Sequence, residues 1–411
     1  MKNIYLRSFL SFLLFFLIIF AYYIAKPVRN SLILEWLGPT KLPMIYLSSS
    51  FITLAAAIFF EKKIKKISPR DLIAICFLIF VALFVGTGLV LIMLPTLGLV
   101  PTFLLYMFIS FFGVATPALF WACCNDSFSE KEAVAFYGFV GLGGILGGLA
   151  GGIVTNYLVK IIGTESLLFV CAGILLIAVP FPYLLIGSFH GERKKVLEDY
   201  SKKTVKNGFQ MVITERHIRV IAVIVISMTI IATFFDFQYQ GIINQVGLAK
   251  DIRTALFAKI FTYINIVGIV IHLVFTRFIL KHFGPLGGLL PLPIISLVAL
   301  IMLKLYPNLN MVVFFWALLG GITYSLQQVS KENLYVPLSR FQKYVSKAYI
   351  DTFIYRAGDG IAGIYLMVLA FMQIQSRSNI FWSTIVLIGI WLYFIISLNI
   401  NNKSRKQEEM E

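Results

Sequence analysis

The most regular feature of the sequence is a series of long apolar runs separated by short polar stretches. A helix that crosses the hydrocarbon core of a bilayer needs about 20 mostly apolar residues, and most of the runs reach that length. A transmembrane β-barrel would instead show segments of about ten residues with alternating hydrophobicity. We therefore predict an all-α polytopic membrane protein with twelve spans, over residues 8–34, 42–60, 72–94, 99–122, 133–156, 166–188, 217–239, 254–276, 286–304, 309–328, 347–371 and 379–400.

Two further patterns support this reading of the runs. Glycine and proline mark breaks between several spans, at Gly38-Pro39, Ser68-Pro69, Pro95, Gly284-Pro285 and Pro307-Asn308. The first run follows basic residues, as the apolar core of a signal peptide does. It is longer than such a core and has no cleavage site of small residues, so we predict a retained helix.

The composition excludes a soluble enzyme, a disulfide scaffold and a disordered chain. Hydrophobic residues make up 59% and charged residues 13%, against about 45–50% and 25% in soluble domains. The net charge of +16 would suggest nucleic acid in a soluble protein. Here 25 of the 35 Lys and Arg lie in, or within three residues of, the segments on the side of the N-terminus, and six lie likewise on the other side. We therefore expect both termini to be cytoplasmic, in the plasma (inner) membrane.

The longest loop, residues 189–216, divides the spans into two groups of six. Its basic run from Arg193 to Lys206 is interpreted as a topology determinant beside anionic lipid, so the bilayer is the expected partner and nucleic acid is not. Two six-helix halves are typical of a major-facilitator-like architecture. The predicted organisation is an N-terminal half (1–188), a basic cytoplasmic linker (189–216), a C-terminal half (217–400) and a cytoplasmic tail (401–411).

The predicted fifth span carries two stripes of glycine, which also support the internal repeat. At a constant offset of 215 residues, Gly143 corresponds to Gly358 and Gly148 to Gly363. Small residues let helix backbones approach closely in lipid. The stripes are therefore expected to be packing surfaces, and the alternative is a sliding surface that lets the two halves move. They consist of Gly143, Gly144, Gly147, Gly148, Gly151 and Gly152.

The first span contains two cations, Lys26 and Arg29, which share a helix face because they are three residues apart, with Asn30 on the side of Lys26. Two interpretations remain open at this stage. The helix could end near Ala25, so that both cations reach the headgroups at the membrane surface. Alternatively, the helix could continue to about Trp36, with both cations facing a substrate pathway.

Charged residues inside other spans are also informative, because a charge in the bilayer centre usually faces a cavity or a partner. Arg356 and Asp359 lie about 60° apart on a helix and could pair or bracket one ligand. Lysine and arginine suit a phosphorylated anion, and the alternative is a set of structural ion pairs. His272 is expected to make an interhelical hydrogen bond rather than to relay protons. The remaining candidates for substrate binding or coupling are Asp236, Lys259 with Tyr263 on its face, and Asp351.

Several kinds of chemistry have no signature in the sequence. There is no phosphate-binding G-x-x-x-x-G-K-[ST] loop, no G-x-S-x-G and no H-E-x-x-H. The four cysteines lie in or beside apolar runs, with no metal-like spacing to the four histidines. We therefore expect no enzyme activity, no metal site and no cofactor. Transport would be driven by ion or solute gradients or by exchange of substrates.

Four segments resemble the ATP/ADP translocases of obligate intracellular bacteria and plastids. They are KPVRN (26–30), FWACCND (120–126) with EAVAFYGFVGLGG (132–144), the acidic residue of the seventh span (Asp236), and SKENLYVPL (330–338) with KAYID (347–351). The resemblance implies a major-facilitator-like fold, nucleotide exchange by alternating access, and a substrate pathway that contains Lys26, Arg29 and Asp236. Within the last pair of segments, Lys331, Glu332 and Asp351 are candidates for coupling or gating.

The sequence departs from this family in two places that concern the substrate. Residues 99–122 contain no Asp or Glu, although the family has an acidic residue there, and Asp359 stands where the family has a lysine. The first hypothesis is a monomeric antiporter for nucleotides or a related phosphorylated anion, in which Lys26, Arg29 and Arg356 hold phosphates. The second is a proton- or sodium-coupled carrier of another solute. The third is a structural or lipid-handling membrane protein that transports nothing.

Overall fold

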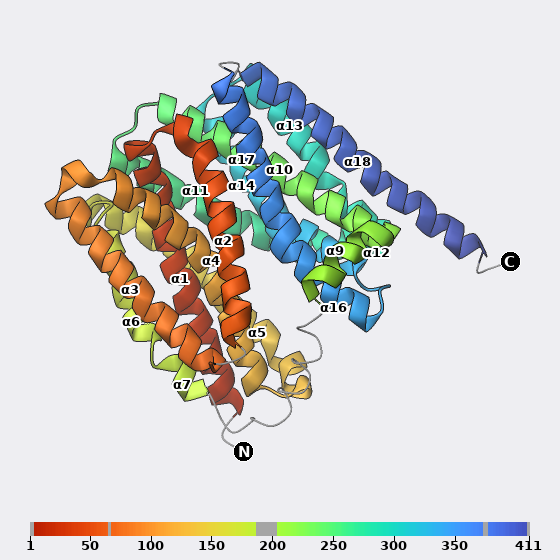
Figure 1. Cartoon of the computed structure of the whole chain (residues 1–411), viewed down its shortest axis with the longest axis horizontal. Helices are drawn as coiled ribbons and strands as arrows, with labels where there is room; N and C mark the ends of the chain where they lie inside the picture. The colour runs from red at the N-terminus through yellow and green to blue at the C-terminus, as the bar shows by residue number, and fades with distance from the viewer. Residues whose placement is uncertain (1–3, 65–66, 186–203, 373–376, 409–411) are drawn as a thin grey trace. The chain divides into compact units, whose positions relative to one another are not determined.

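The computed structural model describes residues 4–64, 67–185, 204–372 and 377–408, and these residues form helices and connecting turns without a β-strand (Figure 1). Ten of the helical stretches are long and apolar enough to cross a membrane. Two further helices, α2 (Leu42–Ile64) with 23 residues and α13 (Pro291–Leu305) with 15, occupy the positions of the remaining two predicted spans. The greater part of the predicted linker 189–216, with most of its basic run, lies outside the described residues.

The described helices group into two compact units. Unit 1 comprises Met1–Gly38, Ile52–Arg193 and Gly247–Asn265. Unit 2 comprises Pro39–Phe51, Lys194–Val246 and Ile266–Glu411. The start of α2 therefore belongs to unit 2, and α11 (Lys250–Val270) belongs to unit 1 as far as Asn265.

Helix α1 (Ile4–Trp36) is the centre of unit 1 and contacts α4, α5 and α6 (Figure 1). Its buried face includes Leu14, Ile18 and Leu32, which pack with phenylalanines of α3 and α4, among them Phe80 and Phe112. The other elements of this unit are α3 (Pro69–Met93), η2 (Pro95–Leu97), α4 (Leu99–Ser127), α5 (Glu130–Ile162), α6 (Leu167–Ala178) and α7 (Phe181–Leu185).

The glycine stripes of α5 lie against two different helices. A Cβ added at Gly143 or Gly147 would lie within 2.5 Å of a backbone carbonyl oxygen of α1, and one at Gly151 would lie 2.8 Å from another. Gly144 faces the Phe15 ring of α1. Gly148 and Gly152 instead face Asn265 and Thr262 of α11. At Gly143, Gly147 and Gly151, a side chain would push α5 away from the backbone of α1.

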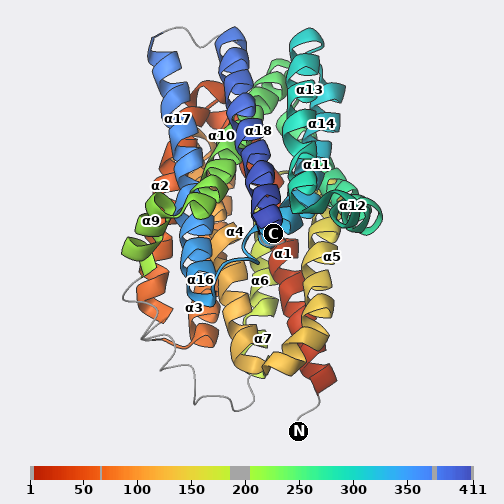
Figure 2. The same cartoon turned by 90° about the vertical axis from the view of Figure 1, so that its right-hand side faces the viewer.

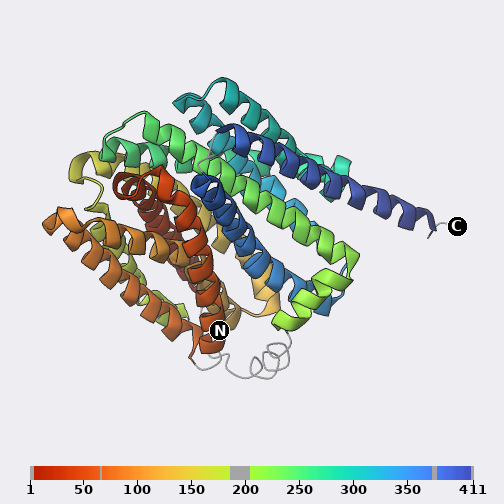
Figure 3. The ribbon, with the colours of Figure 1, turned by 45° about the horizontal axis from the view of Figure 1, so that its top comes forward.

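Unit 2 is built around α10 (Arg216–Gln245), which packs against α17 (Tyr355–Phe371) and α18 (Arg377–Glu408) (Figure 3). The short helices α9 (Thr204–Thr214) and α16 (Arg340–Tyr349) lie side by side (Figure 2). The other elements are η1 (Pro39–Lys41), η3 (Ile271–Thr276), α12 (Arg277–Leu289), α14 (Leu309–Ile322), η4 (Thr323–Gln327), α15 (Gln328–Leu334) and η5 (Ile350–Ile354).

Local sequence explains several helix boundaries and breaks. Gly38 has a positive φ of 66°, directly before Pro39. Ser68 caps α3, and Asn308 caps α14. Gly284 has a φ of 66° and interrupts α12 directly before Pro285. The predicted breaks at these positions are confirmed, since glycine adopts this conformation without steric cost and proline cannot continue the preceding hydrogen-bond ladder.

Helix α1 continues through Pro27 to Trp36. The interpretation that ended this helix near Ala25 is therefore wrong. Both Lys26 and Arg29 lie well inside α1, where their side chains are only partly exposed.

Candidate functional site

Lys26 lies among aromatic rings of unit 1. Its Nζ is 4.1 Å from the ring centroid of Phe261 on α11, and it is 5.8 and 5.7 Å from those of Tyr22 and Tyr23. An ammonium group is attracted to the faces of such rings, more strongly where water is excluded. The rings stabilise the cation without neutralising its charge.

Arg29 contacts neutral groups of α1 and α4. Its Nε donates to Asn30 Oδ1 at 3.1 Å, and its Nη1 donates to Ser110 Oγ at 3.0 Å. The guanidinium carbon is 4.3 Å from the ring centroid of Tyr106. Ser110 in turn donates to the carbonyl of Tyr106 at 2.8 Å, which fixes the hydroxyl that Arg29 contacts.

Neither cation has a carboxylate partner within 4.0 Å in the part of the chain that the structure describes. Two partly buried positive charges therefore stand one helical turn apart on α1 without neutralisation. Such a pair is costly in a membrane unless an anion or water compensates it. A phosphate group fits both side chains, since arginine can bind it with two parallel hydrogen bonds and lysine acts as a point charge.

The structure does not bring Lys259 and Tyr263 to this pair. Both residues are on α11, and the Lys259 Nζ lies 5.6 Å from the Tyr263 ring centroid. Lys259 is exposed. Because Phe261 is two residues, or about 200°, away on the helix, Lys259 points away from the face that meets Lys26.

Asp236 of α10 forms a hydrogen-bonded group inside unit 2. The Tyr46 hydroxyl, at the start of α2, donates to Asp236 Oδ2 at 2.6 Å, and Gln240 Nε2 donates to the same oxygen at 2.5 Å. Gln240 is fully buried and also donates to the Tyr46 hydroxyl at 3.3 Å. These contacts stabilise a charged carboxylate within the span.

Arg356 and Asp359 form the ion pair that their spacing on α17 predicts, with Nη1 and Oδ2 3.1 Å apart. Thr233 of α10 donates to the other carboxylate oxygen of Asp359 at 3.0 Å. Ser50 of α2 donates to the backbone carbonyl of Arg356. The positive charge of Arg356 is therefore compensated within unit 2, in contrast to the charges of Lys26 and Arg29.

The three candidates for coupling or gating all take part in ion pairs near the end of α15. Lys331 Nζ is 2.9 Å from Asp351 Oδ1, and Lys347 Nζ is 2.6 Å from Glu332 Oε2. The Lys331 side chain is 8% exposed, whereas that of Lys347 is 39% exposed. The two pairs join α15 to α16 and η5.

A comparable contact in unit 1 holds the beginning of α1. Arg7 donates to the Ser127 carbonyl at 2.6 Å and pairs with Glu132 at 3.0 Å. Glu132 and Ser129 form a reciprocal cap at the start of α5. The hydrogen bond from the Ser129 amide, together with the Arg7 guanidinium, holds the pKa of Glu132 below its usual range.

Sequence reasoning missed several of these partners. Tyr46 and Ser110 are polar residues inside apolar runs, and Gln240 directly follows one. Gln240 is also four residues from Asp236, a spacing that places both on one helix face. That pattern could have found Gln240, but nothing local points to Tyr46.

His272 is exposed and makes no hydrogen bond among the described residues, so the expected interhelical bond is wrong. Over the same residues, no three His, Cys, Asp or Glu side chains cluster as metal ligands do.

Long apolar helices that carry charged side chains inside their spans are typical of an integral membrane transporter. Residues 4–334 match the model of the Major Facilitator Superfamily. The chain therefore belongs to this superfamily of secondary transporters, which work by alternating access. No protein of curated function matches the sequence.

Solved structures share this fold at low sequence identity. A mutant of the nucleoside transporter NupG superposes with a TM-score of 0.70 and 14% identity over 96% of this chain and 99% of its own. A bacterial homologue of the human lysosomal transporter Spinster gives 0.65 and 11%, over 96% and 97% of the two chains. A peptide transporter of the POT family gives 0.64 and 10%, over 96% of both chains.

Proposed function

We propose that this transporter exchanges nucleotides of the ATP/ADP type, or a related phosphorylated anion, across the inner membrane. It would act as a monomer with both termini in the cytoplasm. The observation that carries the proposal is the pair of uncompensated cations on α1. The resemblance of the KPVRN segment to the ATP/ADP translocases agrees with it, and so does a fold shared with a nucleoside transporter.

The contacts of the two cations favour an anion over a neutral or cationic solute. Arg29 uses Nε and Nη1 for neutral partners, and the structure gives its Nη2 no partner among the described residues. Lys26 is held by rings alone. A phosphate that reached both groups would add charge-assisted hydrogen bonds, which are about twice as strong as neutral ones.

The test is exchange in proteoliposomes. Labelled ATP, ADP and other nucleotides are offered outside, with and without unlabelled nucleotide inside, at zero proton and sodium gradients. Uptake is expected only with internal counter-substrate. Arg29→Lys should reduce uptake about tenfold or more, because a point charge cannot replace a bidentate contact.

Lys304→Gln is the matched control for Lys26→Gln. Lys304 also lies over an aromatic ring, with its Nζ 3.9 Å from the ring centroid of Phe381, but it is on α13, far along the chain from the α1 cations. Lys26→Gln should lose nucleotide binding, and Lys304→Gln should keep it. If neither variant changes binding, or if no nucleotide binds the parent protein, the proposal fails.

The second candidate function, ion-coupled transport of another solute, predicts a different result in the same vesicles. Uptake would then follow a proton or sodium gradient without counter-substrate, and would be lost in Asp236→Asn. Asp236, Asp351 and Asp359 are the candidate coupling carboxylates, and Asp236 is tested first because it lies within α10, where Tyr46 and Gln240 donate hydrogen bonds to it.

A further inference from the structure

Aromatic side chains from three helices of unit 1 meet at one place. The Trp121 indole of α4 has its centroid 5.5 Å from that of Phe15 on α1 and 5.2 Å from that of Tyr137 on α5. Phe15 also stacks on Phe120 of α4, with the centroids 4.5 Å apart and 5° between the ring planes. We call these four residues, Phe15, Phe120, Trp121 and Tyr137, the aromatic cluster.

The Trp121 indole has no ring stacked parallel to it among the described residues. The rings of Phe15, Phe120 and Tyr137 are inclined to the indole by 59–68°. Trp121, Phe15 and Tyr137 are partly exposed, whereas Phe120 is buried. A planar ligand can therefore stack on the indole without displacing an existing parallel stack.

Open space lies beside the aromatic cluster on α5. Tyr137, Gly141 and Gly144 fall within about 60° on one face of that helix. Tyr137 contacts Trp121, and Gly144 contacts the Phe15 ring. A Cβ added at Gly141, between them, would nevertheless meet no atom within 4 Å. Because Gly141 is partly exposed, this space is accessible from outside the helix bundle.

Asn125 adds a hydrogen-bonding group to the same place, one turn after Trp121 on α4. The Tyr137 hydroxyl donates to Asn125 Oδ1 at 2.7 Å. This bond orients the exposed amide and leaves its Nδ2 group, which has two hydrogens, without a partner among the described residues. An amide donor beside an aromatic face suits a nucleobase, which stacks on such faces and forms hydrogen bonds along its edge.

The aromatic cluster is aligned with the cations of the proposed phosphate site. On α1, Phe15 and Lys26 are eleven residues apart. On α4, Trp121 is also eleven residues from Ser110, which accepts a hydrogen bond from Arg29. Eleven residues are three helical turns to within about 20°, or about 16.5 Å along the axis. Both helices therefore present an aromatic ring and a contact of the phosphate site on one face, at the same separation.

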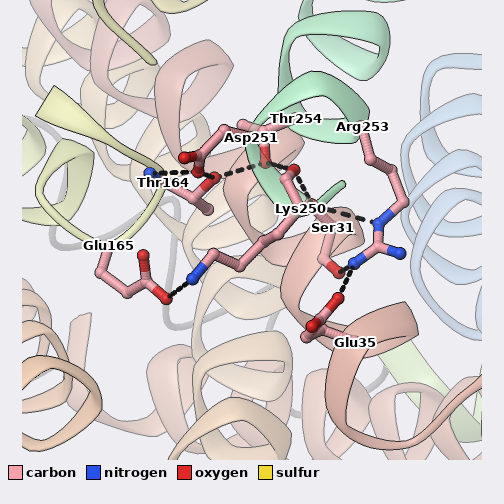
Figure 4. Close-up of polar contacts among 8 residues, drawn as sticks. All are labelled: Ser31, Glu35, Thr164, Glu165, Lys250, Asp251, Arg253 and Thr254. Atoms are coloured by element: carbon pink, nitrogen blue, oxygen red, sulfur yellow. Dashed lines mark hydrogen bonds and ion pairs between the residues drawn. The ribbon is translucent and has the colours of Figure 1, made fainter. Parts of the chain in front are cut away.

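The phosphate end of this line is fixed by α11. Figure 4 shows Arg253 of that helix beside the end of α1, where it donates to the Ser31 carbonyl at 3.1 Å and forms an ion pair with Glu35. These contacts hold the beginning of α11 on α1. They place the Phe261 ring two turns further along, with its centroid 4.1 Å from Lys26 Nζ. Both ends of the line thus belong to unit 1.

We propose that the aromatic cluster is the base-binding subsite of the transporter. The base stacks on Trp121 in the space at Gly141, and Asn125 Nδ2 donates to its edge. The subsite rests on the proposed function, since it takes the phosphates to lie at Lys26 and Arg29. An extended nucleotide carries its base and its terminal phosphate at opposite ends and can reach both places. A small sugar phosphate can reach only one of them.

The first experiment compares two ligands that share a phosphate chain but not a base, ATP and inorganic tripolyphosphate, by calorimetric titration of the purified protein. Trp121→Ala should weaken ATP binding about tenfold or more, because a base stacked on an aromatic side chain contributes this much. It should leave tripolyphosphate binding within twofold of the parent. Trp121→Phe keeps an aromatic face and should retain most of the ATP affinity. Arg29→Gln should weaken the binding of both ligands.

The second experiment fills the open space without removing a ring. Gly141→Leu should weaken ATP binding about tenfold and leave tripolyphosphate binding unchanged. Gly86→Leu is the matched control, since an added Cβ at Gly86 on α3 also meets no atom within 4 Å, and it should change neither affinity. If Trp121→Ala and Gly141→Leu proteins that each elute as a single folded species bind ATP within twofold of the parent, the proposal is overturned.

A third measurement separates the subsite from the proposed function. Adenosine carries a base without phosphate, and its stacking should quench the fluorescence of Trp121 in a variant whose other four tryptophans are replaced by phenylalanine. If adenosine quenches but neither ATP nor tripolyphosphate binds, the phosphorylated substrate is wrong and the base-binding subsite is supported. If tripolyphosphate binds but neither adenosine nor ATP quenches Trp121, the phosphate site is supported and the base-binding subsite is refuted.

Discussion

Two glycines of α5, six residues apart, should respond to alanine with opposite changes in stability. At Gly147, an added Cβ would lie 2.5 Å from the Phe16 carbonyl oxygen and 3.1 Å from the Phe20 amide nitrogen. These atoms belong to the backbone of α1 and cannot rotate away. At Gly141, no atom lies within 4 Å of the added Cβ.

The magnitudes follow from the two environments. Nonbonded carbon atoms are at their optimal separation at about 3.5–4.0 Å, so alanine at position 147 requires α5 and α1 to separate locally by about 1 Å. Overpacking of this kind costs about 1–3 kcal/mol. Alanine at position 141 meets open space and gains about 0.5–1 kcal/mol from its higher helix propensity. The two variants should therefore differ by about 1.5–4 kcal/mol.

The assay is thermal unfolding of the purified variants in one detergent, followed by the fluorescence of the five tryptophans. Gly147→Ala should unfold at a lower temperature than the parent protein, and Gly141→Ala at an equal or higher temperature. Equal shifts for the two variants would show that the close approach of α5 to α1 does not limit stability. That result would refute the packing role assigned to this stripe.

Three other predictions concern ion pairs. Removing either Arg356 or Asp359 alone should destabilise the protein by about 3–5 kcal/mol. The double variant Arg356→Gln with Asp359→Asn should lose less stability than the sum of the losses in the two single variants, which a double-mutant cycle of unfolding measures. Lys331→Met should lower the unfolding temperature clearly, because the Lys331 side chain is buried, whereas Lys347→Met, in a pair of which both side chains are more exposed, should cost under about 1 kcal/mol. Glu132→Gln should lower the unfolding temperature at pH 7. Because the pKa of Glu132 is lower in the folded state, its contribution to stability is present above the unfolded-state pKa and disappears as the pH falls through the folded-state pKa. Thermal unfolding across an acid pH series measures this loss.

Local patterns predicted the features that depend on neighbours in the sequence. The apolar runs locate the helices, and three-residue spacing locates the pair of Arg356 and Asp359, because helix geometry alone brings such residues together. The breaks at Gly38 and Gly284 follow from the conformational freedom of glycine and the rigidity of the proline after it.

The contacts between distant segments could not be predicted in this way. Tyr46 and Asp236 are 190 residues apart in sequence, and Glu35 and Arg253 are 218 residues apart. Each of these contacts depends on how distant helices pack together, and no local pattern in the sequence indicates that packing. The extent of α1 is a similar case. Spacing could not decide whether Lys26 and Arg29 reach the headgroups, because neutral partners such as Ser110 come from another helix.

The two units compensate their intramembrane cations differently, and this difference ranks the candidate phosphate ligands. Arg356 already has a carboxylate partner, so a phosphate could bind it only by sharing or replacing Asp359, which would leave a buried acid unpaired. Lys26 and Arg29 are held by rings, a hydroxyl and an amide, which an anion need not displace. Nucleotide affinity should therefore fall more in Arg29→Gln than in the folded double variant Arg356→Gln with Asp359→Asn, and equilibrium binding of labelled nucleotide measures both. A larger loss in the double variant would place the phosphate contact in unit 2.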